Sequence, residues 1–398
     1  MQMKTKTKIN ALALAAALAL SGCGGGGEGG GEGGDDKGNT QPEQPAPPPI
    51  GAVNKLPSDS FIMTAVDGDT FTLVIDRNTR KAQITPLNTM YGVEATPNIP
   101  VQIFDTDLGI TAYKSDYADK QDGQPFFEIY TSPDGNEIVG QVSVAGLQSN
   151  VIGTNLKIDN AFELPIQGAY NGISMEADSP NAPRSLIDFG VKHENGTLTF
   201  CENGFYANNT CTGSERLAKF SSTWGGMAKL QVNIGDGYRD YAYLLVAQNG
   251  SKYSLILDRL QNDKGRLVYG TGYAVPADEY TLGSSTKTFA CIKQDASGGS
   301  YLSLRDDRTY TQDKYDGKLN YLGSVSGALD LNRAVVGTNV VNAMGLVSFV
   351  EGSSTGLPSN PESRFTRGLA FSKNMMVLAD QKTNSLSVCR SDSLVPKK

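Results

Sequence analysis

The sequence predicts an all-β, antiparallel, hairpin-rich body that follows a glycine- and proline-rich tether. From about Ser58 onward, short runs of alternating apolar and polar residues predominate. Asn-Gly and Asp-Gly pairs separate many of these runs, and such pairs adopt the positive φ angles that tight hairpin turns require. Stretches with helical periodicity are few. The 398 residues include 45 glycines and 18 prolines, a composition that argues against a coiled coil.

Four hairpins are the clearest elements of the body. Their turns are expected at Asp67-Gly68, Asp134-Gly135, Asn195-Gly196 and Asn249-Gly250. A weaker hairpin is expected over residues 374–389. The regular recurrence of hairpins fits tandem sandwiches or barrels, or a propeller-like arrangement.

Two segments also admit a helical interpretation. Residues 214–220 are expected to form two helical turns, and residues 328–346 fit either a helix or a strand-loop-strand. A boundary near residue 165 divides the body into an N-terminal β domain, residues 57–165, and a C-terminal β domain, residues 166–398. The chain is long enough for one large core or two medium ones.

The first 22 residues have the features of a signal peptide. Three lysines precede an apolar run from Ala11 to Leu20, which is about half as long as a membrane-spanning helix must be. The sequence Leu20-Ser21-Gly22-Cys23 resembles the lipobox of bacterial lipoproteins. This resemblance implies cleavage before Cys23 and lipid modification of that cysteine (palmitate), which ties the chain to a lipid bilayer. In this class, Gly24 in place of an aspartate favours the outer membrane.

Residues 23–56 form the lipidated cysteine and the tether in this interpretation. Gly24 to Gly34 contains nine glycines and two glutamates, and five prolines follow between Pro42 and Pro49. This composition cannot form a core, and it would hold the body a few tens of ångströms from the lipid. We expect display on the cell surface, with a periplasmic location as the alternative.

Four cysteines remain after Cys23 is assigned to lipid. An even number in an exported protein indicates disulfides. We expect Cys201 to pair with Cys211, because the residues between them favour turns, and Cys291 to pair with Cys389. Four cysteines allow three connectivities, so the other two pairings stay open.

Charge and histidine content exclude several function classes. Lys and Arg total 35 against 42 for Asp and Glu, and the net charge of −7 argues against binding to nucleic acid. His193 is the only histidine, which disfavours triads and most zinc sites. Residues 352–356 match the G-x-S-x-G pattern, but Pro358 follows and no histidine lies downstream. We therefore assign no catalytic residue.

The acidic segment around Asp105, Asp107 and Asp116 is the best candidate for a metal site. Clustered carboxylates beside glycines suit Ca²⁺, although the spacing is not that of an EF-hand. A solvated acidic loop is the alternative. No other cofactor is expected.

Aromatic residues give the strongest indication of recognition, since the chain has seventeen tyrosines and one tryptophan. Tyr238, Tyr241 and Tyr243 lie close together in sequence, with Trp224 upstream. On a regular strand, Tyr241 and Tyr243 share one face. These side chains either pack against cross-strand partners or form a contact surface for a protein or glycan.

Three classes of function fit these observations. The first is an outer-membrane lipoprotein whose β-rich body is a non-enzymatic binding module for a protein, a glycan or a host molecule. The second is a periplasmic lipoprotein that assembles or inhibits another envelope protein. The third is a carboxylate-based enzyme such as a glycoside-acting protein, because two acids suffice for that chemistry and leave no motif.

Overall fold

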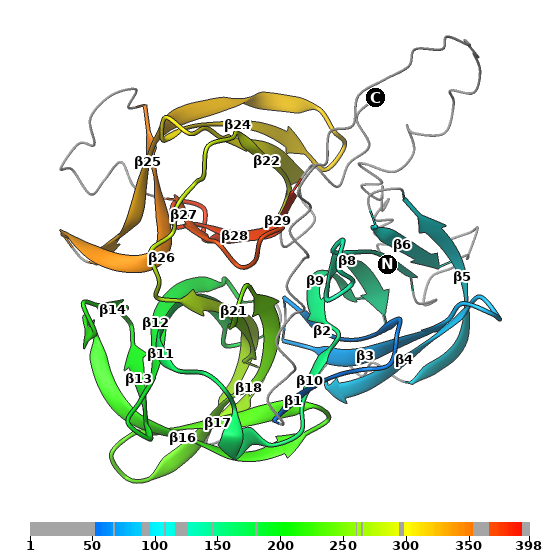
Figure 1. Ribbon diagram of the computed structural model, residues 1–398, viewed down its shortest axis with the longest axis horizontal. Coiled ribbons are helices and arrows are strands. Elements are labelled where there is room, and N and C mark those ends of the chain that lie inside the picture. Colours follow the sequence, from blue (N-terminus) through cyan, green and yellow to red (C-terminus); the bar gives the residue numbers. More distant parts are fainter. Residues whose placement is uncertain are drawn as a thin grey trace, which may run out of the picture.

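The computed structural model describes residues 52–66, 68–89, 95–106, 109–115, 126–144, 147–179, 182–259, 261–263, 266–293, 298–336, 338–352 and 366–391. These residues form three consecutive barrels of antiparallel strands, which Figure 1 shows packed side by side. The predicted all-β, hairpin-rich body is confirmed. Of the alternatives considered, tandem barrels are present rather than a propeller. The leader and most of the tether lie outside the described residues.

The first barrel contains eight strands that pair in sequence order, and β9 closes it by pairing with β2. Its interior is filled by apolar side chains such as Phe71, Tyr113 and Phe127. The strands are β2 (Ser60–Ala65), β3 (Thr70–Asp76), β4 (Lys81–Asn88), β5 (Thr96–Asp105), β6 (Thr111–Ser115), β7 (Phe126–Thr131), β8 (Glu137–Val144) and β9 (Leu147–Thr154).

The second barrel closes because β21 pairs with β11 as well as with β19. The short pair β14 and β15 lies beside it, and β20 extends its sheet. The strands are β11 (Gly168–Ala177), β12 (Ser185–Glu194), β13 (Thr197–Glu202), β14 (Tyr206–Ala207), β15 (Thr210–Cys211), β16 (Ser214–Trp224), β17 (Met227–Asn233), β18 (Tyr238–Asn249), β19 (Lys252–Asp258), β20 (Gln261–Asp263) and β21 (Arg266–Pro276).

The third barrel also has eight strands in sequence order, and β29 closes it on β22. Leu302, Leu329 and Phe349 fill its interior. The strands are β22 (Lys287–Lys293), β23 (Gly298–Leu304), β24 (Thr309–Asp316), β25 (Tyr321–Val336), β26 (Asn339–Glu351), β27 (Thr366–Leu369), β28 (Met375–Asp380) and β29 (Ser385–Ser391).

A small element connects the first two barrels. β1 (Val53–Lys55) and β10 (Leu156–Ile158) lie before and after the first barrel in sequence and pair with each other. Val53 and Ile158 belong to the core of the second barrel, together with residues of the 3₁₀ turn η1 (Ala161–Glu163). The expected boundary near residue 165 thus falls between η1 and β11, and residues 166–398 contain two barrels.

A shared apolar core holds the three barrels together. Strand β2 places Phe61 and Met63 inside the first barrel and Ile62 in the shared core. In strands β18 and β28, too, some side chains point into the interior of their own barrel and others into the shared core. Because these strands are buried on both faces, each barrel is fixed against its neighbours.

The predicted hairpins form, and their turns lie at the expected residues. Asn195 and Gly196 both have positive φ, 52° and 75°, between β12 and β13. The other three predicted turns also lie between paired strands, although Asp67 itself is outside the described residues. The weaker hairpin is present as β28 and β29.

The helix predicted over residues 214–220 is wrong, because this segment lies in β16. Ala218 and Phe220 alternate with exposed residues and pack into the second barrel, so a two-residue period decides its conformation. Residues 328–346 belong to the strands β25 and β26, the non-helical alternative. Among the residues described, no helix is long and apolar enough to cross a membrane.

The structure contains the two expected disulfides, Cys201–Cys211 and Cys291–Cys389. The first joins β13 to β15, beside the second barrel. The second joins β22 to β29, the strands whose pairing closes the third barrel. It therefore links the two ends of that barrel covalently.

Removing Cys291–Cys389 is expected to cost more stability than removing Cys201–Cys211. The bridged residues are 98 and 10 positions apart, so the chain-entropy model gives about 4.7 and about 2.7 kcal/mol. Urea unfolding of the C291A/C389A and C201A/C211A variants measures both losses. Equal losses, or the reverse order, would contradict the larger loss expected for the bridge that closes the longer loop.

Candidate functional site

The strands β16, β17 and β18 carry an exposed aromatic cluster on the outside of the second barrel. The Trp224 side chain is 44% exposed, and its ring centroid lies 5.3 Å from that of Tyr243. Lys229 Nζ lies 5.3 Å from the Tyr243 ring centroid. We call Trp224, Tyr243, Lys229 and Asp240 the aromatic face.

The charged pair in the aromatic face is fixed by hydrogen bonds. Lys229 Nζ donates to Asp240 at 2.9 Å, and Gln231 Nε2 donates to the same carboxylate at 2.7 Å. The bond to Asp240 raises the pKa of Lys229 above its ordinary value. Burial acts to raise the pKa of Asp240, but the bonds from Gln231 and Lys229 outweigh it and lower that pKa. Both groups are therefore charged at neutral pH.

The β16–β17 turn holds Trp224 in place against the first barrel. Gly225 and Gly226 have φ of 59° and 84°, which glycine adopts without strain. A Cβ on Gly226 would lie 2.8 Å from Cδ1 of Ile62 in the first barrel. The turn thus packs directly against the first barrel, and this contact between barrels sets the position of Trp224.

Tyr241 does not belong to the aromatic face. Its neighbours Asp240 and Ala242 pair with successive residues of β17, which leaves Tyr241 as the extra residue of a β-bulge. Tyr241 packs inward on Phe200, with 4.3 Å between ring centroids, whereas Tyr243 faces outward. The expectation that Tyr241 and Tyr243 share a face is wrong, because the bulge changes the alternation.

Buried charges surround Tyr241. The Arg259 guanidinium carbon lies 3.4 Å from the Tyr241 ring centroid, and Arg259 Nε donates to Glu176 at 2.8 Å. Both members of this ion pair are almost fully buried. Tyr241 is therefore part of the barrel interior, where it covers a paired arginine.

Tyr238 is also separate from the aromatic face. It is 39% exposed and pairs with Asn233 at the far end of the β17–β18 hairpin. Lys219 Nζ lies 4.3 Å from its ring centroid. Of the four aromatic residues predicted to bind, the structure thus brings together Trp224 and Tyr243.

The predicted metal site is described only in part. Asp105 accepts hydrogen bonds from Arg77 Nη1 at 2.9 Å and from Thr111 Oγ1 at 2.6 Å, and these lower the pKa of its carboxyl. Asp107 and Asp116 lie outside the described residues. No cluster of three metal-ligating side chains occurs among the residues that are described. Calcium binding stays a prediction.

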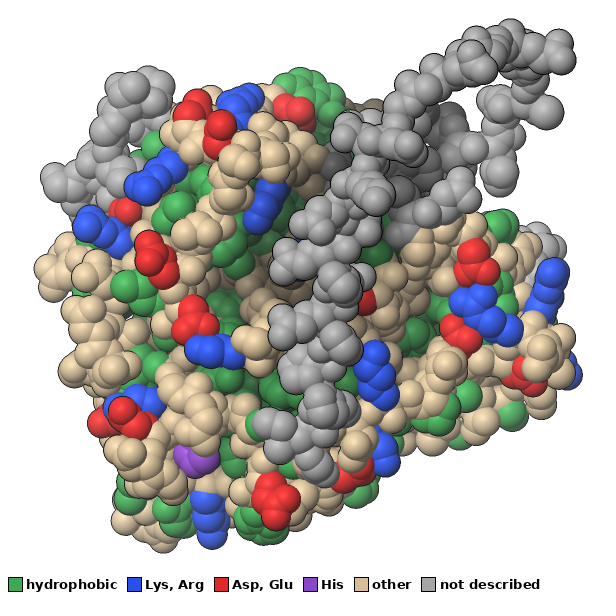
Figure 2. All heavy atoms as spheres, in the orientation of Figure 1, with side chains coloured by type: hydrophobic (Ala, Val, Ile, Leu, Met, Phe, Trp, Pro, Cys, Tyr) green, Lys and Arg blue, Asp and Glu red, His purple; other side chains and the backbone are tan. Residues whose placement is uncertain are grey.

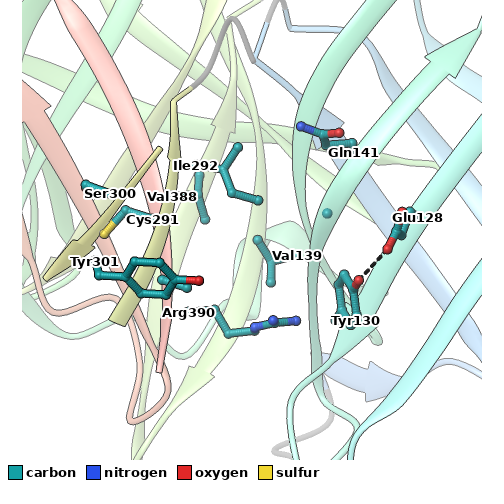
Figure 3. Close-up of a pocket in the computed structure, with 12 residues that line it drawn as sticks. Glu128, Tyr130, Val139, Gln141, Cys291, Ile292, Ser300, Tyr301, Val388 and Arg390 are labelled. Atoms are coloured by element: carbon teal, nitrogen blue, oxygen red, sulfur yellow. Dashed lines mark hydrogen bonds between the residues drawn. The ribbon is translucent and has the colours of Figure 1, made fainter. Parts of the chain in front are cut away.

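A cleft between the first and third barrels was not predicted. Figure 3 shows Arg390 of β29 lying between the rings of Tyr130 and Tyr301, with Gln141 at the opposite end of the cleft. Val139, Ile292 and Val388 lie between these ends. The cavity has a volume of about 60 Å³.

A buried carboxyl lies beside this cleft. Glu137, at the start of β8, is 3% exposed, and its Oε2 accepts a hydrogen bond of 2.7 Å from Ser372 Oγ of the third barrel. Its Oε1 has no partner among the described residues. Burial raises the pKa of Glu137 to about 8, although the bond from Ser372 acts in the opposite direction. The carboxyl is therefore mostly protonated at neutral pH.

Charged side chains of both signs are interspersed on the face that Figure 2 shows. This distribution agrees with the charge balance of the sequence, which argues against a phosphate-binding surface.

Two further residues considered in the sequence analysis do not belong to the aromatic face. His193 hydrogen-bonds through Nδ1 with the carbonyl oxygen of Ile166 at 2.8 Å. The G-x-S-x-G serine falls outside the described residues.

Comparison with known proteins gives little similarity. No family model matches the sequence, and no curated protein matches it. A solved structure of a DUF3598-family protein of unknown function from Nostoc punctiforme is 9% identical, with a TM-score of 0.17 over 85% of this chain and 94% of that one. Isotype 1 transferrin-binding protein B from serogroup B Neisseria meningitidis is 10% identical, with a TM-score of 0.17 over 85% and 77%. Such TM-scores carry no argument about fold or function.

Titration of Glu137 is expected to make the protein less stable as pH rises from about 4.5 to about 8. The folded state keeps a proton through this range that the unfolded chain releases, so the free energy of unfolding falls and then levels off above pH 8. The Glu137→Gln protein should lack the fall in the free energy of unfolding that the titration of Glu137 causes. Urea unfolding at several pH values measures the difference between the two proteins.

Ser372→Ala serves as the matched variant in this experiment. It deletes the hydrogen bond that lowers the pKa of Glu137, so the decline should continue to higher pH than in the native protein. If Glu137→Gln and the native protein show the same pH dependence, Glu137 does not titrate in the expected range.

Proposed function

We propose that this protein is an outer-membrane lipoprotein, attached through a lipid on Cys23, whose body is a non-enzymatic binding module. Residues 24–51 serve as the tether between lipid and body. This tether is shorter than the expected 23–56, because Val53–Lys55 form β1 and Val53 packs into the core of the second barrel. The body binds a protein, a glycan or a host molecule through the aromatic face. We favour surface display over a periplasmic role, because the glycine-rich tether resembles the leaders of surface lipoproteins, and the same tether would also serve in the periplasm.

The exposure of Trp224 is the observation that carries the proposed binding role. It is the only tryptophan of the chain, and almost half of its side chain is in contact with solvent. Tryptophan and tyrosine are enriched in recognition surfaces, because their rings offer a large contact area with few rotatable bonds. A paired ammonium and carboxylate, Lys229 and Asp240, flank the rings and supply polar contacts.

Rigid support strengthens this proposal. The Trp224 ring rests on Tyr243, and the adjoining turn is seated against the first barrel. A contact surface that is already ordered loses less conformational entropy on binding than a mobile one. The aromatic face is therefore organised for binding before a ligand arrives.

Protease treatment of intact cells tests the location. We expect the body to be degraded without permeabilisation, because a protein displayed on the surface is accessible to added protease. Cys23→Ser should abolish membrane attachment, which detergent phase partitioning measures. Protection of the body until the cells are permeabilised would overturn surface display and favour the periplasmic alternative.

Fluorescence of the single tryptophan tests the aromatic face. Panels of purified glycans and host serum proteins are titrated against the protein, and a ligand at this face should change the Trp224 emission. Tyr243→Ala should weaken binding of that ligand by about tenfold or more, as truncation of a central aromatic contact does. Tyr321→Ala, which alters a more exposed tyrosine of the third barrel, is the control.

Two results would contradict this use of the aromatic face. One is a ligand that binds without affecting Trp224 emission and with unchanged affinity for the Tyr243→Ala protein. The other is an equal loss of affinity in the Tyr321→Ala control.

A further inference from the structure

The cleft between the first and third barrels holds an arginine that forms no hydrogen bond or ion pair with the described residues. Arg390 is 8% exposed. Its guanidinium carbon lies 4.2 Å from the ring centroid of Tyr130, and no hydrogen bond or ion pair to Arg390 occurs within the described part of the chain. An arginine stays charged even when buried, and no hydrogen bond or ion pair with a described residue compensates the desolvation of Arg390. Burial indeed lowers the pKa of Arg390.

The neighbouring acids among the described residues form no ion pair with Arg390, although the charge of Glu128 acts on it from a distance. Glu128 lines the same cleft, but its carboxylate accepts a hydrogen bond from the Tyr130 hydroxyl and lies 3.8 Å from Lys114 Nζ. Glu137 lies in the adjoining small cavity and is bound to Ser372. Neither carboxylate forms an ion pair with Arg390 among the described residues.

A second unused donor lies at the other end of the cleft. Gln141 is 8% exposed, and its Nε2 has no partner among the residues described. The described residues thus leave two donor side chains facing the cleft, Arg390 and Gln141, and one unpartnered oxygen, Glu137 Oε1, beside it. Because buried donors are almost always paired in proteins, this arrangement indicates that an acceptor belongs in the cavity.

The middle of the cleft determines what kind of acceptor fits. Val139, Ile292 and Val388 separate Arg390 from Gln141 and offer only apolar surface (Figure 3). A volume of about 60 Å³ has room for about five water-sized groups. An inorganic anion would leave the apolar walls uncovered, whereas a carboxylate with a short aliphatic chain covers them.

We propose that the cleft between the first and third barrels binds a small monocarboxylate, with its carboxylate on Arg390 and its aliphatic chain against Val139, Ile292 and Val388. The planar guanidinium suits bidentate binding of a carboxylate. Glu128 and Tyr301 line the cleft and are partly exposed to solvent. This site goes beyond the proposed function and is separate from the aromatic face.

Titration calorimetry with propionate tests the site in the full-length protein. We expect one propionate to bind per chain, with an affinity in the millimolar range or tighter for so small a ligand. Propionamide has the same shape without the charge and should not bind. Sodium chloride at the same concentration should not compete.

Variants of Arg390 identify the binding group. Arg390→Met should lose at least tenfold in propionate affinity, and without ligand it should melt no lower than the native protein, because it removes an uncompensated buried charge. Arg390→Lys keeps the charge without the planar fork and should bind more weakly than the native protein. Arg305→Gln, an exposed arginine of the third barrel, is the matched control and should bind normally.

Three results would overturn the proposal. These are no heat with millimolar propionate, equal affinity in the Arg390→Met protein, or equal competition by chloride, which would make the cleft a general anion site. The outcome does not depend on the proposed function, because Trp224 emission reports on the other surface. A protein that binds no ligand at the aromatic face can therefore still bind propionate in the cleft, and the two proposals can fail separately.

Discussion

The burial of one outer face of each barrel in a single shared core is the constraint on which the rest of the structure depends. A barrel of eight strands can fill its own interior with side chains, as all three barrels do. Strands β2, β18 and β28 bury their outward side chains as well. The apolar area involved would be exposed if a barrel stood alone, so the hydrophobic effect favours one fixed arrangement of all three. Surfaces formed by two barrels are then as rigid as those formed by one.

Polar groups at the junctions between barrels differ in how well they are paired. Between the first two barrels, buried Asp258 accepts hydrogen bonds from Thr70 Oγ1 and Asn88 Nδ2, each at 2.8 Å. Between the first and third barrels, Arg390 has no polar partner and Glu137 has one bonded oxygen, within the described part of the chain. Unpaired buried groups cost stability, and proteins keep such costs mainly where a ligand or a reaction compensates them. The difference between the junctions is the physical reason to look for a ligand at the second.

Local rules predicted the parts of this fold that are local. Asn195-Gly196 specifies its hairpin because both residues adopt positive φ, and the turn-forming residues between Cys201 and Cys211 favoured the observed pairing among three possible ones. Barrel closure was beyond such rules, since β9 finds β2 and β29 finds β22 across long stretches of chain. The bulge at Tyr241 shows the same limit, because one inserted residue reverses the face on which a tyrosine lies.

The cleft between the first and third barrels was beyond prediction for the same reason. Arg390 and Gln141 are 249 positions apart in sequence, and only packing of whole barrels brings them to one cleft. Continuous apolar runs in β2 and β28 were the available signal for strands buried on both faces.

The two surfaces depend on the shared core in different ways. The glycine turn beside the aromatic face packs against Leu87 and Ile62 of the first barrel, so this surface is formed before any ligand binds. The cleft is formed by two barrels, and a ligand in it contacts both. Any ligand that binds only when the first and third barrels are in contact stabilises that contact by mass action. The hydrogen bond between Ser372 and Glu137 lies at the same junction, so protonation of Glu137 and occupation of the cleft act on one interface. Protonation of Glu137 and occupation of the cleft both require the first and third barrels to be packed together. Each event therefore stabilises the barrel contact on which the other event depends.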